Sequence, residues 1–421
     1  MSHVKGDLHL PSELALEENF NLILDKISPT DDLSKQRKNA FQQFKSFGLP
    51  SKKIEKWHYS DLRKLLTEKA IKSNCLEYKN NAENSLLFPN SLLISEKAIN
   101  DIDVVNVKEY LKDGNLFSSS FAPAKDDIST NLNTAFSNNG WIISVKENSH
   151  VKTPIELGYN VSDDTQLHCT HEINIEKNAK VFFVEKYQDT EKTKDTFATS
   201  TTRLDIGENS DVVWFIFHDT TNQQQLSRFE ANLGKNSKLT LFYFNIKNNN
   251  FIRQEILVNL NDSNANFQLR AINLLSGDSH NDLTMEVKHK AENTISKEII
   301  HNILSQKAKG IFQGVIKVAK EAQKTDAKMN CNSLLLSDTV EFNAKPELEI
   351  FAEDVACGHG ATVSEINKNH LFYLMARGIE KDIARSLIVK AFIAELLEDL
   401  KQEEQIEILL NYTDKWLLNN L

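Results

Sequence analysis

Cysteine, proline and glycine are scarce in this chain of 421 residues, which has 4, 7 and 13 of them. The cysteines, Cys75, Cys169, Cys331 and Cys357, are widely scattered. A disulfide framework is therefore not expected, and a reducing cytoplasm fits this usage. Because no C-x-x-C pair exists, the chain alone is not expected to offer a four-thiolate cage for a stable cluster or a structural zinc.

Other absences exclude whole classes of function. No apolar run approaches 18 residues, so no membrane-spanning helix is expected. The first residues lack a charged segment followed by an apolar one, which predicts no secretory signal. The net charge is −10 and there is no basic stripe, so nucleic acid is not favoured as a partner. No G-x-x-x-x-G-K-[ST], G-x-S-x-G or H-E-x-x-H motif occurs, and the chain is expected not to be an enzyme.

Helical periodicity marks both ends of the chain. In residues 1–88, apolar side chains recur at helical spacing through Leu16, Phe20 and Ile23, and Gly48 stops a second helix. Residues 364–421 return to helix. There the segment IEKDIARSLIVKAFIAELLEDL is amphipathic, with Ile383, Leu387, Ala391 and Leu396 predicted near one face and Ile379 leading in. This face is either a helical cap on the middle of the chain or a docking surface for a partner, and both can hold.

Between these ends, in residues 89–363, short alternating apolar runs flank a recurring polar turn. Each turn contains Asn with a small neighbour, and successive small residues are 31, 27, 28 and 29 positions apart; they are Ala179, Ser210, Ser237, Ala265 and Thr294. A near-constant step with one strand–turn–strand motif indicates a repeat architecture. Asn suits a left-handed backbone position at low cost.

The length of this repeat indicates a parallel β-helix, in which each coil contributes short strands stacked on the next coil. A propeller blade would need a longer repeat of about 40 residues. An immunoglobulin-like sandwich would not show one repeating motif. The chain is therefore predicted to be mainly β, with a parallel β-helix flanked by helical domains.

The segment KPELEIFAEDVACGHGATV, residues 345–363, carries the most specific chemistry. Its alternation predicts a strand, in which residues two apart share a face. Cys357 and His359 would then stand side by side, with Gly358 and Gly360 allowing close approach of another backbone or a ligand. Thiolate and imidazole are both good ligands for iron or zinc. The alternative is a small buried Cys beside a surface His.

A second Cys/His cluster occurs at residues 168–171, with the sequence HCTH. Cys169 and His171 would share a strand face, with His168 on the other. Chance exposure of these side chains is preferred here over a ligand role.

Several of these segments resemble one known family. KPELEIFAEDVACGHGATVSEIN with HLFYLMARGI, the lead-in TDAKMNCNSLLLSDTVEFNA and the N-terminal GLPSKKIEKWHYSDLRKL are similar to segments of the SufB/SufD proteins of the Suf iron–sulfur cluster assembly machinery. The C-G-H-G-A-T core is closer to the SufD form, although the family often has Ser or another residue at position 358. The likeness runs over nearly the whole chain and is most specific at residues 326–385.

The resemblance implies a right-handed parallel β-helix between helical domains, and a scaffold that pairs with a SufB-like subunit and binds a SufC-like ATPase. It places Cys357 and His359 at the SufB interface, where they would help to assemble a transient iron–sulfur cluster, with sulfur supplied indirectly by a cysteine desulfurase. The ATPase is expected on the C-terminal helices, at Ile379, Ile383, Leu387, Ile388, Ala391 and Phe392.

Three alternatives remain at this point. The chain could be a SufB-like scaffold subunit, or a homodimer when isolated, because an exposed β-helix edge can pair with a second copy. More remotely, it could be a polysaccharide-active β-helix enzyme, since that fold also carries lyases and hydrolases. Such enzymes need a carboxylate cluster on a groove, and the acidic residues here are dispersed.

Overall fold

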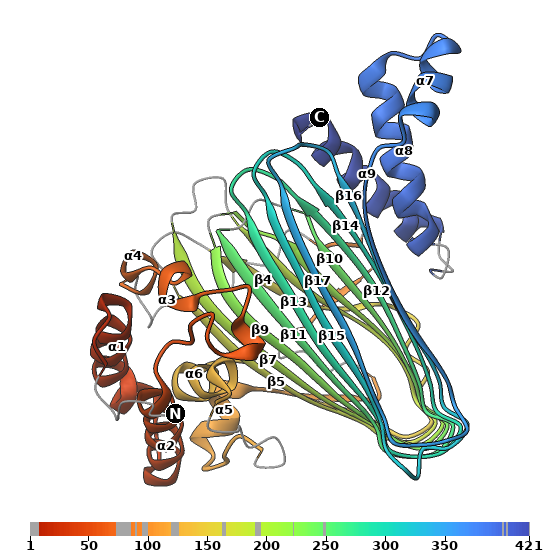
Figure 1. Ribbon diagram of the computed structural model, residues 1–421. Helices are drawn as coiled ribbons and strands as arrows, with labels where there is room; N and C mark the ends of the chain where they lie inside the picture. The colour runs from red at the N-terminus through yellow and green to blue at the C-terminus, as the bar shows by residue number, and fades with distance from the viewer. Residues whose placement is uncertain are drawn as a thin grey trace.

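The structure is a computed structural model that describes residues 8–72, 86–88, 91–94, 100–118, 126–161, 166–189, 195–221, 223–246, 250–397, 400 and 403–420. Its centre is a flattened coil of two facing nine-stranded sheets, and the chain alternates between them (Figure 1). All neighbouring strands are parallel except β2 and β3. The predicted mainly β, parallel β-helix fold with helices at both ends is confirmed.

We name the two sheets by their strands. Sheet I contains, in spatial order, β1 (Leu92–Leu93), β4 (Ile155–Val161), β6 (Lys180–Asp189), β8 (Asp211–Asp219), β10 (Lys238–Asn245), β12 (Asn266–Leu275), β14 (Ile295–Leu304), β16 (Asp326–Leu335) and β18 (Ala356–Glu365). Sheet II contains β2 (Ile102–Asn106), β3 (Asn139–Val145), β5 (Leu167–Ile175), β7 (Thr196–Ile206), β9 (Gln223–Leu233), β11 (Phe251–Leu260), β13 (His280–His289), β15 (Lys309–Val318) and β17 (Glu341–Ile350).

The turns between coils follow the repeat predicted from the sequence. The Asn before each predicted small residue has a positive φ between 53° and 61°; these are Asn178, Asn209, Asn236, Asn264 and Asn293. Their side chains also form a ladder, in which the amide of Asn209 donates to Asn178 and that of Asn236 donates to Asn209, at 3.1 and 2.9 Å. The expectation that Asn occupies a left-handed turn position is therefore confirmed.

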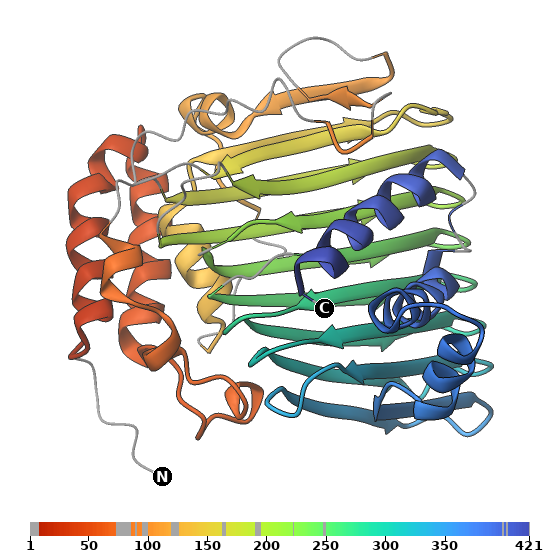
Figure 2. The same cartoon turned by 90° about the horizontal axis from the view of Figure 1, so that it is seen from above.

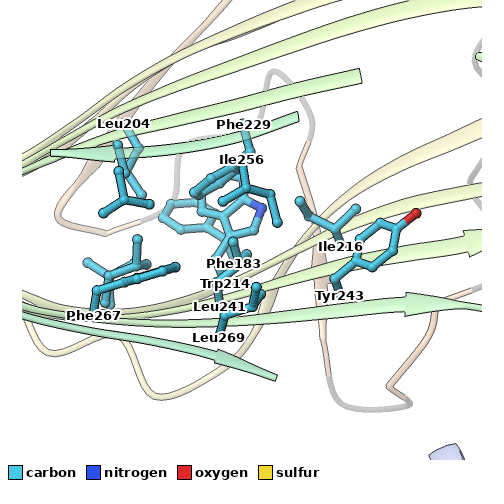
Figure 3. Packing of buried hydrophobic residues seen from close by; sticks show 14 of the residues in the cluster. Phe183, Leu204, Trp214, Ile216, Phe229, Leu241, Tyr243, Ile256, Phe267 and Leu269 are labelled. Carbon is cyan, nitrogen blue, oxygen red and sulfur yellow. The ribbon is translucent and has the colours of Figure 1, made fainter. Parts of the chain in front are cut away.

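Inward-facing side chains of both sheets fill the coil with one continuous apolar core. Trp214 lies at its centre, with ring centroids 4.9 Å from Phe183 and 5.5 Å from Phe229 (Figure 3). Stacking of coils repeats the same inward positions, so each layer packs on the next. This packing fixes which face of every strand points inward.

Helices cover the outer faces of the two sheets. The helices α1 (Pro11–Ile27), α2 (Asp31–Phe47), η1 (Glu55–Trp57), α3 (Leu62–Leu65), α4 (Glu68–Ile71), α5 (Val107–Lys112) and α6 (Ile128–Phe136) lie on the side of sheet II. The helices α7 (Lys368–Ala376), α8 (Lys381–Leu397) and α9 (Glu403–Asn420) follow the coil, and α8 and α9 pack on sheet I (Figure 2).

The helices α5 and α6 lie in a region for which only strands were predicted. The side chain of Asp127 accepts a hydrogen bond from the Thr130 amide and so begins α6. Ile128, Leu132 and Phe136 then form one apolar face, which packs with the N-terminal helices. These nine residues carry a helical period that the surrounding strand repeat conceals.

Arg37 of α2 ties the N-terminal helices to this part of the chain. Its buried guanidinium donates to the carbonyl oxygens of Thr134 and Ala135 at 3.1 Å and of Ser137 at 2.6 Å. These are carbonyls at the C-terminal end of α6, where a helix favours a cation. Burial lowers the pKa of Arg37 to about 9, so holding the charge is costly.

We expect Arg37→Met to lower the free energy of unfolding by about 3 kcal/mol. The variant removes a costly buried charge, but it leaves three carbonyl oxygens without a donor, and the second effect is larger. Chemical denaturation measures the loss. Arg63→Met is the matched control, since Arg63 is exposed and, among the residues that the structure describes, pairs with Asp61 alone; it should change stability by less than about 0.5 kcal/mol. Equal stability of the two variants would show that Arg37 does not stabilise the contact between the N-terminal helices and the end of α6.

Candidate functional site

Strands β17 and β18 end the two sheets, and neither has a fully buried residue. In the described part of the chain no strand pairs beyond them, so their outer edges offer backbone N–H and C=O groups. Side chains that would be core elsewhere in the coil are exposed here, among them Val363 at 51%. This end of the coil, which we call the open end, is defined by residues 341–365.

Cys357 and His359 lie on β18, as the alternation predicted, and on its inward face. In register they continue two rows of buried residues of β16: Cys357 is beside Ala327, and His359 is beside Met329. Cys357 is partly buried against the core and His359 is exposed. The structure therefore places a thiol and an imidazole together at the open end.

The surroundings of Cys357 favour the thiol over the thiolate. Partial burial raises the pKa of Cys357, and the nearby Asp326 carboxylate raises it further, while a hydrogen bond from the Ala327 backbone opposes them. A thiolate ligand at this position would therefore need a bound metal or a change of environment. The outward neighbour Gly358 has open space around it, since a Cβ built there would meet nothing within 4 Å.

A buried carboxyl group, that of Glu298, lies deeper in the coil in the same row as Met329 and His359, and the sequence did not predict it. It faces inward from β14 and is in register with Met329, one strand further from the end. Both of its oxygens are buried and lack a hydrogen bond of good geometry among the described residues. Burial raises the pKa of Glu298 to about 8, with partial relief from Ser296, its own backbone amide and Arg270. The signal available in the sequence was an acidic residue at an inward position of an alternating run.

The residues 168–171 are buried rather than exposed, so that part of the prediction is wrong. Cys169 and His171 face the core and His168 faces α6, as the alternation predicted. His171 is hydrogen-bonded to Tyr159 at 3.0 Å, and His168 to Thr199 at 2.8 Å. Burial lowers the pKa of both histidines to about 3. The cluster is a set of neutral, hydrogen-bonded core groups.

Among the described residues, no three His, Cys, Asp or Glu side chains converge as a ready metal site. A Ser–His–Asp group does occur where Ser60 contacts β13, but its geometry is not that of a catalytic triad. The Ser60 hydroxyl bonds both His280, at 3.0 Å, and Asp282, at 2.6 Å. Asp282 also holds Arg253 at 2.7 Å, and so it ties side chains together instead of orienting the histidine.

A cleft of about 550 Å³ lies on the outer face of sheet II, between η1, the start of α6 and strands β9 to β17. Neither Cys357 nor His359 lines it. Its charged side chains pair with one another, as Lys317 does with Glu286 and Glu349 at 3.3 Å. Carboxylates held by cations are poor general acids, although burial raises the pKa of Glu230, which lies 3.6 Å from Arg228 in the same cleft.

Part of the predicted partner surface on α8 is exposed. Ile383, Leu387 and Ala391 form an exposed stripe, with Ile383 at 53% and Leu387 at 43%. Ile379, just before α8, and Ile388 are half-buried. No described helix is both long enough and apolar enough to cross a membrane.

Two other residues of α8 face the coil. Leu396 was predicted on the stripe but is buried against sheet I, because thirteen positions from Ile383 carry it round to the opposite side of the helix. Phe392 is half-buried, and its ring stacks on His301 at 4.0 Å. One face of α8 therefore caps sheet I, and a different face carries the exposed stripe.

The preceding helix, α7, has no buried residue at all. Phe372 is 72% exposed and Tyr373 57% exposed, which is unusual for aromatic side chains. Gly378 follows with a φ of 84°, the stop expected from the sequence. Figure 1 shows α7 projecting away from the coil, so its exposed aromatic side chains extend the apolar surface that begins with the stripe of α8.

Comparison with known proteins agrees with this architecture. Residues 159–392 match the model of the SUF system FeS cluster assembly SufBD core domain, and residues 16–87 match that of the SufBD protein N-terminal region. An iron–sulfur cluster assembly SufBD family protein of Synechocystis is 26% identical over 89% of both chains. The assembly protein SufD of Escherichia coli is 36% identical over 36% of both chains, and SufD of Bacillus subtilis is 27% identical over 65% of this chain and 63% of its own. The chain belongs to the SufBD family of the SUF system for iron–sulfur cluster assembly.

Proposed function

We propose that this chain is a non-catalytic scaffold subunit that pairs through its open end with a SufB-like subunit, and that a nascent cluster forms between them. The observation that carries the proposal is the inward-facing Cys357 and His359 pair on the last strand of a coil whose end is uncovered. One thiolate and one imidazole are too few for a cluster, so the partner must supply further ligands. The cluster is then carried by the complex only transiently.

The edges of the open end support such pairing physically. A partner with two strands in matching register would extend sheets I and II together, and would cover the exposed inward side chains. Phe351, at 69% exposure beside the end of β17, would be buried by the same contact. Iron and sulfide would be the cargo of this site, with the sulfur supplied by a cysteine desulfurase system in a reducing cytoplasm.

We place the ATPase partner on α7 and α8. The exposed stripe of Ile383 and Leu387 offers apolar anchors to a groove, as helix-in-groove binding requires. Since α8 also contacts sheet I through Phe392 and His301, movement of the helix would act on the coil. ATP-driven dimerisation of two ATPase subunits would thus favour a rearranged interface that admits iron and sulfide.

Co-expression with the SufB-like and SufC-like chains of the same genome tests the proposal. Native mass spectrometry of the eluted complex should show one copy of this chain, one SufB-like chain and two ATPases. A chain that ignores both partners overturns the proposal. Pairing with a second copy of itself in their presence would favour the homodimer instead.

The double variant Ile383→Asp and Leu387→Asp should bind the ATPase about thirtyfold more weakly, because it places charge on two apolar anchors. Both side chains are exposed, so the fold should be unchanged. Leu22→Asp is a matched control, since Leu22 of α1 is 67% exposed on another helix. Titration calorimetry measures the affinities, and an unchanged affinity in the double variant would remove α8 from the interface.

A further inference from the structure

One row of side chains on the outer face of sheet I changes from apolar to polar as it approaches the open end. Its apolar members pack in the cluster that joins sheet I to the C-terminal helices, and its last three members can all form hydrogen bonds. We call it the outer row; in register from β8 to β18 it contains Phe217, Phe244, Ile272, His301, Asn332 and Thr362. Because His301 is fully buried, its ring nitrogens need hydrogen-bond partners.

The three polar members of the outer row are bonded end to end, from α8 to β18. Nδ1 of His301 is 2.7 Å from the carbonyl oxygen of Phe392 in α8. The side-chain amide of Asn332 lies 3.3 Å from Nε2 of the same ring. The Thr362 hydroxyl of β18 donates to Oδ1 of Asn332 at 2.7 Å. One helix and three strands are therefore joined by consecutive hydrogen bonds.

The donors and acceptors of this row are mutually consistent. A carbonyl oxygen only accepts, so Nδ1 of His301 carries the hydrogen, and Nε2 of the neutral ring is left as an acceptor for the Asn332 amide. Burial lowers the pKa of His301, against the opposing effects of the Phe392 carbonyl and Glu395, which favours this neutral ring. Asn332 then offers its oxygen to Thr362. Neighbouring bonds in such a network strengthen one another, so losing one weakens the next.

Both ends of the row contact elements that the proposed function uses. In α8, the Phe392 ring also stacks on the His301 imidazole, with centroids 4.0 Å apart, so a shift of the helix acts directly on this histidine. At the other end, Thr362 is three residues beyond His359 on β18. That strand ends sheet I and, in the described part of the chain, has backbone pairing with β16 alone. The bond from Thr362 therefore adds to the contacts that fix its position.

We propose that His301, Asn332 and Thr362 are positioning residues, which couple the place of α8 on sheet I to the place of β18 and hence of Cys357 and His359. The inference rests on the proposed function, in which α8 binds the ATPase and β18 carries the cluster ligands. When α8 is drawn away from sheet I, His301 loses its carbonyl acceptor and its stacking partner, and the bonds to Asn332 and Thr362 weaken in turn. The row thus favours one position of β18 while α8 is docked and releases it when α8 moves.

Hydrogen exchange of residues 356–365 in the full chain, read by mass spectrometry, tests this coupling. His301→Phe keeps an aromatic ring to stack on α8 but removes both hydrogen bonds of the imidazole. Thr362→Val keeps the shape of an exposed side chain and removes only the last bond. The matched control is Arg385→Met, which removes another hydrogen bond of α8, to the carbonyl of Leu336, outside the outer row.

Each of the two row variants is expected to speed exchange in β18 at least about threefold, the effect of losing one net hydrogen bond. The double variant should be no faster than the faster single one. His301 and Thr362 are two strands, or about 9.6 Å, apart, so their effects are non-additive only if they share Asn332 as a partner. Arg385→Met should leave β18 unchanged. The inference is wrong if His301→Phe exchanges at the wild-type rate, if the two effects multiply, or if the control has the same effect.

The complex gives a second measurement, which a purely structural role of His301 would not affect. A non-hydrolysable ATP analogue should change exchange in β18 of the wild-type complex, and this response should be lost in His301→Phe although the ATPase still binds. An equal response in both complexes would overturn the coupling. A chain that does not assemble with its partners contradicts the proposed function instead, and the measurements on the chain by itself still decide whether the row joins α8 to β18.

Discussion

A chain carrying Cys357→Ala and His359→Ala is expected to assemble with its partners but to lose nearly all cluster formation. Removing a group that only orients a metal ligand already costs about tenfold or more in metal affinity, so losing two direct ligands should cost about a hundredfold or more. Neither side chain is fully buried, and the alternating pattern of β18 is kept. The complex should therefore form normally while its capacity to hold iron and sulfide falls.

Anaerobic reconstitution of the purified complex with Fe²⁺ and sulfide, followed by visible absorption, measures this loss. Two single variants test whether the loss of cluster formation is specific to Cys357 and His359 or follows from removing any cysteine or histidine. Cys331→Ala removes a thiol whose pKa burial raises to about 12, and His370→Ala removes an exposed imidazole of α7. Both should form clusters at the wild-type level. Wild-type cluster formation in the double variant would show that Cys357 and His359 are not the site.

The open end carries features that limit unwanted pairing of its exposed strand edges. Edge strands usually carry features that prevent indiscriminate pairing. Here Pro346 lies within β17, opposite Gly314 of β15, and removes one N–H donor from the edge. Lys345 and Glu347 next to it are paired with each other at 3.0 Å. A partner must therefore match both the missing donor and the charges, which favours one specific subunit over random association.

Much of the coil could be predicted from the sequence because its rules are local. The Asn turns require a left-handed backbone, and alternation fixes which residues share a face, so Cys357 and His359 were placed together correctly. The parallel β-helix could be predicted from the repeat because each coil places its inward side chains at the same positions. These predictions depended only on residues a few positions apart.

The errors occurred where distant segments meet. Residues 168–171 were expected to be exposed, but α6 and the N-terminal helices cover the outer face of β5. Leu396 was assigned to the exposed face of α8, although sheet I buries it. The row that joins Glu298 to His359 depends on the pairing of three strands, and a sequence alone does not show that register.

Replacing Glu298 with Gln is expected to stabilise the chain, and to do so more as the pH rises. The pKa of Glu298 is raised from 4.5 to about 8 by burial. Between these values the folded chain holds a proton that the unfolded chain has released, so folding takes up a proton and stability falls with rising pH. Each pH unit in this window costs about 1.4 kcal/mol, and below it the cost disappears.

The glutamine variant cannot titrate and lacks this dependence. At pH 8 it should exceed wild type by about 4 kcal/mol in the free energy of unfolding, whereas at pH 5 the two should agree within about 1 kcal/mol. Chemical denaturation at both pH values measures the difference. Glu185→Gln should be destabilised instead, because its carboxyl accepts bonds that an amide cannot all replace. Parallel pH profiles for wild type and Glu298→Gln would show that the Glu298 carboxyl is not held neutral in the coil, and that solvent or the donors at Ser296 and its own backbone stabilise its charged form.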